Sequence, residues 1–126
     1  MGADLAYIGT RFIASHEGNA AEGYKQAIVE ANAADIVYTN LFSGVHGNYM
    51  RQSILNAGLD PDNLPLSDKS KMDLSGGASK FKAWKDIWGA GQGVGLMDEI
   101  QPAAQIVAQL RAEYHAARHR LLAQGA

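Results

Sequence analysis

The sequence predicts an α/β fold with one or two short strands and a mainly helical remainder. A short apolar run near the start is typical of a buried strand, whereas most later apolar residues recur at helical steps of three and four. Fourteen of the 126 residues are glycine and only three are proline, so glycine marks the boundaries between segments. The length suits a single domain or part of one, residues 1–126.

Composition excludes several classes of function. Eleven Lys and Arg against 13 Asp and Glu give a net charge of −2, which predicts no nucleic-acid partner and no attraction to an acidic membrane. The absence of cysteine excludes disulfides and thiolate metal sites. Because no apolar stretch is long enough to span a membrane and the start does not resemble a signal peptide, we expect a cytoplasmic protein.

The first segments read as a strand, a helix and a second extended segment. Asp4–Ile8 is short and mainly apolar and is closed by Gly9-Thr10, which predicts a strand of the parallel, buried type. Ala21–Glu30 carries apolar residues on one helical face. Asp35–Thr39 is rich in β-branched residues and is predicted to be extended.

Two further helices are predicted in the middle of the chain, on either side of a surface segment. Tyr49–Ala57 has a helical apolar face, and Gly58 is placed where glycine relieves the left-handed backbone that ends a helix. The polar segment Leu59–Ser79 is expected at the surface. Lys80–Trp88 is predicted to be helical because its aromatic residues recur at helical spacing.

The longest predicted helix lies near the C-terminus, after the glycine-rich loop Gly89–Gly95. It spans Pro102–Ala123, with proline tolerated in the first turn. One side of this helix carries a continuous apolar stripe that needs a partner surface. The stripe consists of Ile106, Val107, Leu110, Tyr114, Ala117 and Leu121.

The first predicted strand lacks neighbours within this chain. A parallel strand is buried on both faces, and Asp35–Thr39 is the one other candidate strand. An eight-unit barrel takes about 250 residues, so this chain could supply only a portion of one. We therefore expect the chain taken alone to be mostly helical, with Asp4–Ile8 poorly paired.

Gly9 and Thr10 form a candidate phosphate site. Where a strand passes into a helical turn, unpaired N–H groups and the helix dipole can bind an anion. Gly9 would allow close approach, and the Thr10 hydroxyl could donate another hydrogen bond. Two residues also fit an ordinary strand-to-helix turn, so the residue types alone leave both interpretations open.

Four segments, taken together and in order, resemble the C-terminal portion of the nitronate monooxygenase family, formerly called 2-nitropropane dioxygenases. They are Gly9–Ala14, Tyr24–Val29, Gly44–Asn48 and Gly89–Gly95, and the resemblance covers nearly the whole chain. The Gly-Thr-Arg-Phe run that begins at Gly9 is also similar to that of flavin-dependent enoyl-carrier-protein reductases.

The resemblance implies a TIM-type (β/α)8 barrel that binds FMN and oxidises nitronates with molecular oxygen. Residues 1–31 would then be the last barrel strand, phosphate loop and helix, and residues 32–126 a helical and loop extension. Gly9 and Thr10 would bind FMN, and Gln92 would lie near the cofactor or substrate, unless it belongs to a flexible connection. The family's catalytic histidine segment has no counterpart here, so we assign no catalytic residue and expect the chain alone to be inactive.

The histidines offer weaker candidates. His46 lies between loop glycines and could reach a ligand, but we favour its interpretation as a solvated or hydrogen-bonded loop residue. His115 and His119 are one helical turn apart, but no third metal ligand is evident, so they are assigned to the solvent side of the helix.

The remaining candidates have structural interpretations. Trp84 and Trp88 are at core spacing, and Asp60 and Asp62 read as turn residues because a calcium loop would need a glycine. Two alternatives to a nitronate monooxygenase remain: a non-enzymatic helical interaction module, and part of a flavin-dependent enoyl-carrier-protein reductase. The sequence leaves the oligomeric state open.

Overall fold

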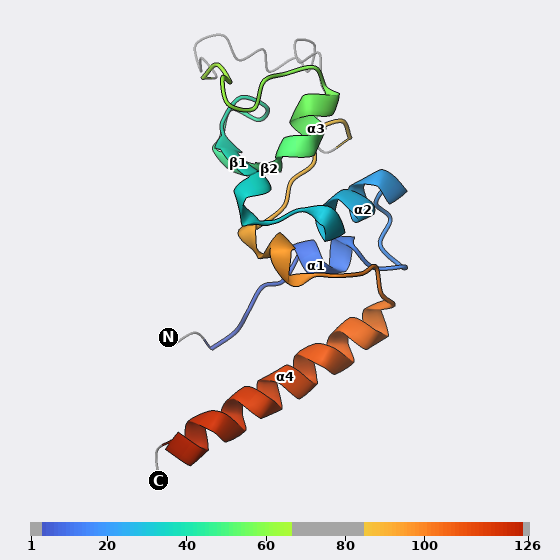
Figure 1. Ribbon diagram of the computed structural model, residues 1–126, viewed down its shortest axis with the longest axis vertical. Helices are drawn as coiled ribbons and strands as arrows, with labels where there is room; N and C mark the ends of the chain where they lie inside the picture. Colours follow the sequence, from blue (N-terminus) through green and yellow to red (C-terminus); the bar gives the residue numbers. More distant parts are fainter. Residues whose placement is uncertain (1–3, 67–84, 125–126) are drawn as a thin grey trace.

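The computed structural model describes residues 4–66 and 85–124. In these ranges, the chain forms helices and one two-stranded sheet (Figure 1). The helical elements are α1 (Thr10–Ile13), α2 (Glu22–Glu30), the 3₁₀ helix η1 (Ala33–Asp35), α3 (Arg51–Asn56), the 3₁₀ helix η3 (Gln92–Leu96) and α4 (Ala103–Gln124). The strands are β1 (Ile36–Thr39) and β2 (Gly47–Met50).

The predicted strand at Asp4–Ile8 does not form. This segment is irregular, and Leu5 and Tyr7 are almost fully exposed. A strand needs a neighbour that accepts its hydrogen bonds, and the described residues supply none here. The prediction of a strand is therefore wrong for this chain, whereas the expectation that the segment is poorly paired is confirmed.

The sheet is antiparallel, and its register pairs Ile36 with Met50 and Thr39 with Gly47. The expected extended segment at Asp35–Thr39 is confirmed, starting one residue later because Asp35 ends η1 and completes a capping box with Asn32. Ile87–Ala90 then runs beside β2, where the Met50 N–H donates to the Trp88 carbonyl at 2.8 Å.

These pairings correct two helix predictions. Tyr49 and Met50 belong to β2, so the predicted helix at Tyr49–Ala57 is shortened to α3. The described end of the predicted helix at Lys80–Trp88 is a turn followed by a bridge, and residues 80–84, including Trp84, lie outside the described residues. Hydrogen bonds to distant segments override local helix propensity in both places.

Other boundaries agree with the sequence. Helix α2 begins one residue later than predicted, and α4 lies within one residue of the predicted range. Gly58 follows α3 with a φ of +76°, which confirms the expected left-handed helix end. The glycine-rich loop Gly89–Gly95 is more ordered than expected, because it contains the bridge at Gly89 and most of η3.

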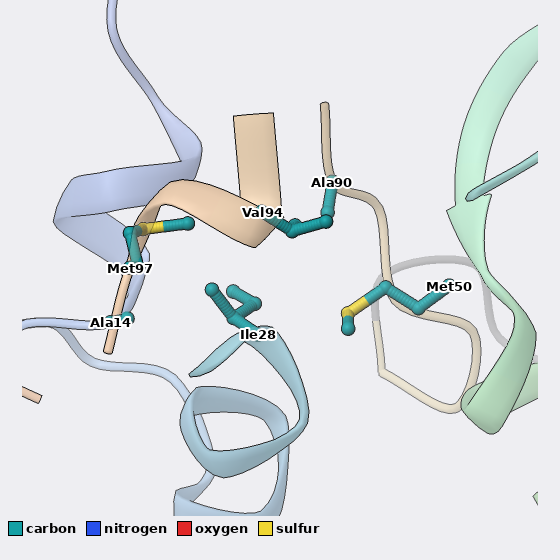
Figure 2. Close-up of a cluster of buried hydrophobic side chains, with 6 residues drawn as sticks. All are labelled: Ala14, Ile28, Met50, Ala90, Val94 and Met97. Carbon is teal, nitrogen blue, oxygen red and sulfur yellow. The ribbon is translucent and has the colours of Figure 1, made fainter. Parts of the chain in front are cut away.

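The main core lies where α2, β2 and the segment before α4 meet. Figure 2 shows Ile28 pointing toward side chains from η3 and the flanking segments. A second cluster of Tyr49, Ile54 and Ile87 packs α3 against the sheet. The buried members of the main core are Ala14, Ile28, Met50, Ala90, Val94 and Met97.

Helix α4 is attached mainly at its beginning. Ile106 is buried, but the rest of the predicted apolar stripe is exposed or half-buried. In Figure 1 the helix extends below the other elements. Within residues 4–66 and 85–124, no helix has the combination of length and apolar character needed to cross a membrane.

Candidate functional site

The predicted phosphate turn lies at the start of α1. Gly9 is the residue before the helix, and its carbonyl oxygen accepts hydrogen bonds from the N–H groups of Phe12 and Ile13. The first-turn N–H groups of Thr10 and Arg11 have no preceding helical carbonyl to bind. A Cβ placed on Gly9 would meet nothing within 4 Å, so the space beside this turn is open.

Thr10 joins this turn to the glycine-rich segment 81 residues later in the chain. Its Oγ1 accepts a hydrogen bond from the Gly91 N–H at 2.9 Å. A hydroxyl that accepts this bond can still donate its own proton to a ligand. The structure therefore brings together two of the segments that carried the family resemblance.

A pocket of about 460 Å³ opens beside the turn. Its walls come from the N-terminal segment, α1, η3 and α4, so it combines peptide N–H groups, a guanidinium and apolar surface. It is lined by Tyr7, Ile8, Gly9, Thr10, Arg11, Gly93, Leu96, Met97, Leu110 and Glu113.

Arg11 is a site residue that the sequence reasoning did not single out, although it lies within the Gly-Thr-Arg-Phe run. Its Nη1 donates to the Leu96 carbonyl at 3.2 Å and its Nη2 to Gln109 Oε1 at 2.6 Å. Its Nε is buried and has no partner among the described residues. Arg11 thus holds α1, η3 and α4 around the pocket and adds positive charge beside Thr10.

Gln92 lies at the beginning of η3 but does not line this pocket. Its Oε1 accepts a hydrogen bond from Asn48 Nδ2 at 3.3 Å, which ties η3 to β2. The neighbouring Gly93 lines the pocket instead. A cofactor-binding role for Gln92 stays a prediction.

The histidine candidates lie elsewhere. His46 stacks on the exposed ring of Tyr38, with ring centroids 4.9 Å apart, and does not line the pocket. His115 and His119 are exposed on α4. In the part of the chain that the structure describes, no three His, Asp or Glu side chains gather as a metal site would require.

The aromatic and acidic candidates have structural roles. Trp88 stacks on Tyr24 with ring centroids 5.2 Å apart. The Asp60 carboxylate accepts the Asp62 N–H at 3.0 Å, which confirms the turn interpretation. Arg51 donates two hydrogen bonds to Asp62, and this holds the pKa of the Asp62 carboxyl below its usual value.

Comparison with known proteins adds independent information. The family model described as "Nitronate monooxygenase" matches residues 1–113. A probable nitronate monooxygenase of Bacillus subtilis (strain 168) is 31% identical over 120 residues, covering 87% of this chain and 33% of that protein. A nitronate monooxygenase of Paraburkholderia phytofirmans is 31% identical over 119 residues, covering 90% of this chain and 32% of that protein. The chain therefore spans about a third of the length of these relatives.

The fold is also found in solved structures. The M276A mutant of FabK from Thermotoga maritima superposes with a TM-score of 0.62 at 26% identity, over 95% of this chain and 36% of that one. FabK from the same organism gives a TM-score of 0.55 at 24% identity, over 90% and 37% of the two chains. With a family match over most of its length and two relatives at 31% identity, the chain belongs to the nitronate monooxygenase family.

Proposed function

We propose that this chain is the C-terminal portion of an FMN-dependent barrel enzyme that oxidises nitronates with molecular oxygen. The single observation that carries the proposal is the family match over residues 1–113, which includes the Gly9-Thr10 turn and the Gly89–Gly95 segment. The activity belongs to the complete barrel, and we expect the chain alone to be inactive. Its substrates are the nitronate and oxygen.

The residues at the turn fit the phosphate end of FMN. The open space at Gly9 lets an anion approach the first-turn N–H groups, and Thr10 keeps a hydroxyl proton to donate. Arg11 adds positive charge at the same pocket, and Glu113, which also lines it, accepts a hydrogen bond from Gln109 at 2.9 Å. Gly9 and Thr10 thus supply half of a phosphate site.

These contacts separate the role of the chain from the role of the flavin. The flavin, when bound, supplies the electron transfer between nitronate and oxygen. The chain's own residues would hold the phosphate: Gly9 would provide access and Thr10 would donate a hydrogen bond, while the Gly91 N–H fixes the Thr10 hydroxyl oxygen. These residues would therefore contribute to cofactor binding and orientation.

A chimera tests the proposal. The matching third of the Bacillus subtilis relative is replaced by this chain, and the purified protein is assayed for bound FMN and for oxygen consumption with a nitronate. We expect both. A folded chimera without flavin, or without oxygen-dependent turnover, contradicts the proposal.

Thr10→Val in the same chimera tests the phosphate site. Valine keeps the shape of threonine but removes the hydroxyl, so the affinity for FMN should fall about tenfold, corresponding to the loss of a hydrogen bond to a charged group. Riboflavin lacks the phosphate and serves as the matched control ligand. An equal loss for FMN and riboflavin would show that Thr10 acts on the fold rather than on the phosphate.

An enoyl-carrier-protein reductase of the same flavin class is the second candidate, because the Gly-Thr-Arg-Phe run at Gly9–Phe12 is similar in both families. The chimera separates the two. Flavin reduction by a nicotinamide nucleotide followed by reduction of an enoyl thioester, with no oxygen-dependent loss of nitronate, would favour the reductase.

A further inference from the structure

The segment that follows the phosphate turn lies beside the segment that leads into α4, and hydrogen bonds join the two. The bridge between Ser15 and Gln101 is parallel, and the bonded residues follow the same order along both segments. The bonded pairs are Thr10 with Gly91, Arg11 with Leu96, His16 with Gln101 and Glu17 with Ala103. The turn is therefore attached to the C-terminal part of the chain at successive positions.

Arg11 extends this attachment to α4 itself. Its Nη2 donates to Gln109 Oε1 at 2.6 Å, while its Nη1 donates to the Leu96 carbonyl at 3.2 Å. The amide of Gln109 is engaged at both ends, because its Nε2 donates to Glu113 Oε1 at 2.9 Å. The amide oxygen of Gln109 is thus held toward the guanidinium, and one side chain joins α1, η3 and α4.

We propose that Arg11 is a positioning residue of the phosphate site and that Gln109 acts on the site through it. Arg11 holds the turn against η3, where the Gly91 N–H meets the hydroxyl oxygen of Thr10 at 2.9 Å. The attachment of α4 then raises the affinity of the turn for the phosphate group. The inference rests on the proposed function, because the phosphate is that of FMN.

The contacts of Arg11 favour positioning over direct phosphate binding. Both nitrogens at the tip of its side chain already donate to protein acceptors, in Leu96 and Gln109. Its Nε is buried, so an anion in the open pocket does not reach this atom. A rigid guanidinium bonds two separate acceptors at once, whereas a lysine ammonium is a point charge on a flexible stem. The geometry of Arg11 is therefore used, and not its charge alone.

Gln109 gives the inference a distinctive consequence. It is uncharged and does not line the 460 Å³ pocket beside the turn. Any effect that it has on phosphate affinity must therefore pass through a neighbour, and Arg11 is the neighbour that joins it to the turn. Coupling between two sites is reciprocal, so a bound phosphate should in turn stabilise the attachment of α4.

Arg11→Lys in the chimera with the Bacillus subtilis relative separates geometry from charge. Lysine keeps the positive charge but does not span both acceptors, so the affinity for FMN should fall roughly two- to tenfold, the range expected for one hydrogen bond. The affinity for riboflavin, which lacks the phosphate, should stay unchanged and so shows that the variant is folded. An unchanged affinity for FMN, or an equal loss for both ligands, overturns the proposal.

Gln109→Met tests the contribution of α4. Methionine keeps the length of the side chain and the charge of the helix but removes the acceptor, so the affinity for FMN should fall while that for riboflavin does not. The matched control is Gln105→Met, one helical turn earlier, where the exposed glutamine side chain has no hydrogen-bond partner in the described ranges. Equal FMN affinities of the Gln109→Met and Gln105→Met variants overturn the proposal.

The double variant shows whether Gln109 acts through Arg11. If it does, Gln109→Met should cause little further loss of FMN affinity once Arg11→Lys is present. If the two losses multiply, Gln109 acts by another route, such as its bond to Glu113 in the pocket wall, and the proposal is overturned.

Hydrogen exchange tests the reciprocal effect. FMN should slow amide exchange in the first three turns of α4, residues 103–113, more than riboflavin does, and Arg11→Lys should abolish the difference. Equal protection by the two ligands overturns the coupling. A chimera that binds no flavin overturns the proposed function as well, whereas one that binds FMN with equal strength before and after Gln109→Met overturns this inference alone.

Discussion

Tyr24 shows how one side chain can join two segments that are distant in the sequence. Its ring stacks on Trp88 with an angle of 11° between the planes, and its hydroxyl donates a hydrogen bond to the Gly89 carbonyl. Burial raises the pKa of the Tyr24 hydroxyl, so this group remains a protonated donor at neutral pH. Tyr24 therefore fixes α2 against the segment that leads into η3.

Tyr24→Phe should lower the free energy of unfolding by about 1 kcal/mol, because the stacked ring is kept while the Gly89 carbonyl loses its donor. Urea denaturation followed by circular dichroism measures the change. The matched control is Tyr38→Phe, since Tyr38 also stacks on a ring but is largely exposed. Equal effects of the two substitutions would show that the hydrogen bond from Tyr24 to the Gly89 carbonyl contributes nothing to the free energy of unfolding.

Among the elements, α4 has an N-terminus that is capped by Glu17, a residue distant in the sequence. The Ala103 N–H donates to Glu17 Oε2 at 2.8 Å, across 86 residues. The neighbouring His16 N–H donates to the Gln101 carbonyl at 3.0 Å. The Ala103 N–H holds the pKa of the Glu17 carboxyl below its usual value, as expected for a carboxylate at the positive end of a helix.

Glu17→Gln should lower the melting temperature at neutral pH. Because the pKa of Glu17 is lower in the folded than in the unfolded state, its carboxylate stabilises the fold above the unfolded value of about 4.5. This stabilisation is lost as the pH falls through the folded pKa.

Melting curves of wild type and Glu17→Gln, recorded at neutral pH and in acid, measure this contribution. The difference in melting temperature between the two proteins should be largest at pH 7 and should vanish in acid. Asp4→Asn, in the exposed N-terminal segment, is the control and should show no difference at either pH. A difference for Glu17→Gln that persists in acid would mean that the charge is not what matters.

For the whole molecule, stability depends on a core built from short separate segments. Ile28 is fully buried, and its cluster includes Ala14 before α2, Met50 of β2 and Val94 of η3 (Figure 2). No single element buries its apolar face without the others. Unfolding of this core should therefore be cooperative.

Ile28→Ala should lower the free energy of unfolding by about 2–5 kcal/mol, because it leaves a cavity where these segments meet. Since small domains are stable by only about 5–15 kcal/mol, the midpoint of urea denaturation should fall strongly. Val45→Ala, at an exposed position, is the control and should leave the midpoint nearly unchanged. A small effect of Ile28→Ala would show that the cluster is not the common core.

Two residues of the candidate site could be predicted from the sequence, but its assembly could not. Gly9 and Thr10 were identified by a local strand-to-helix pattern and by family resemblance, and both line the pocket beside α1. Arg11 was missed because its role depends on Leu96 and Gln109, which approach it only in the folded chain. No local spacing encodes a contact across nearly a hundred residues.

The sequence by itself determined the elements that depend on nearby residues. Helix α2 and the left-handed end of α3 at Gly58 follow from periodicity and the freedom of glycine, and β-branched residues indicate the extended segment that pairs as β1. Only the tertiary structure decided that Asp4–Ile8 remains unpaired and that Tyr49 joins β2 instead of a helix. The physical reason is that a strand is completed by hydrogen bonds to another segment, whereas a helix satisfies its own.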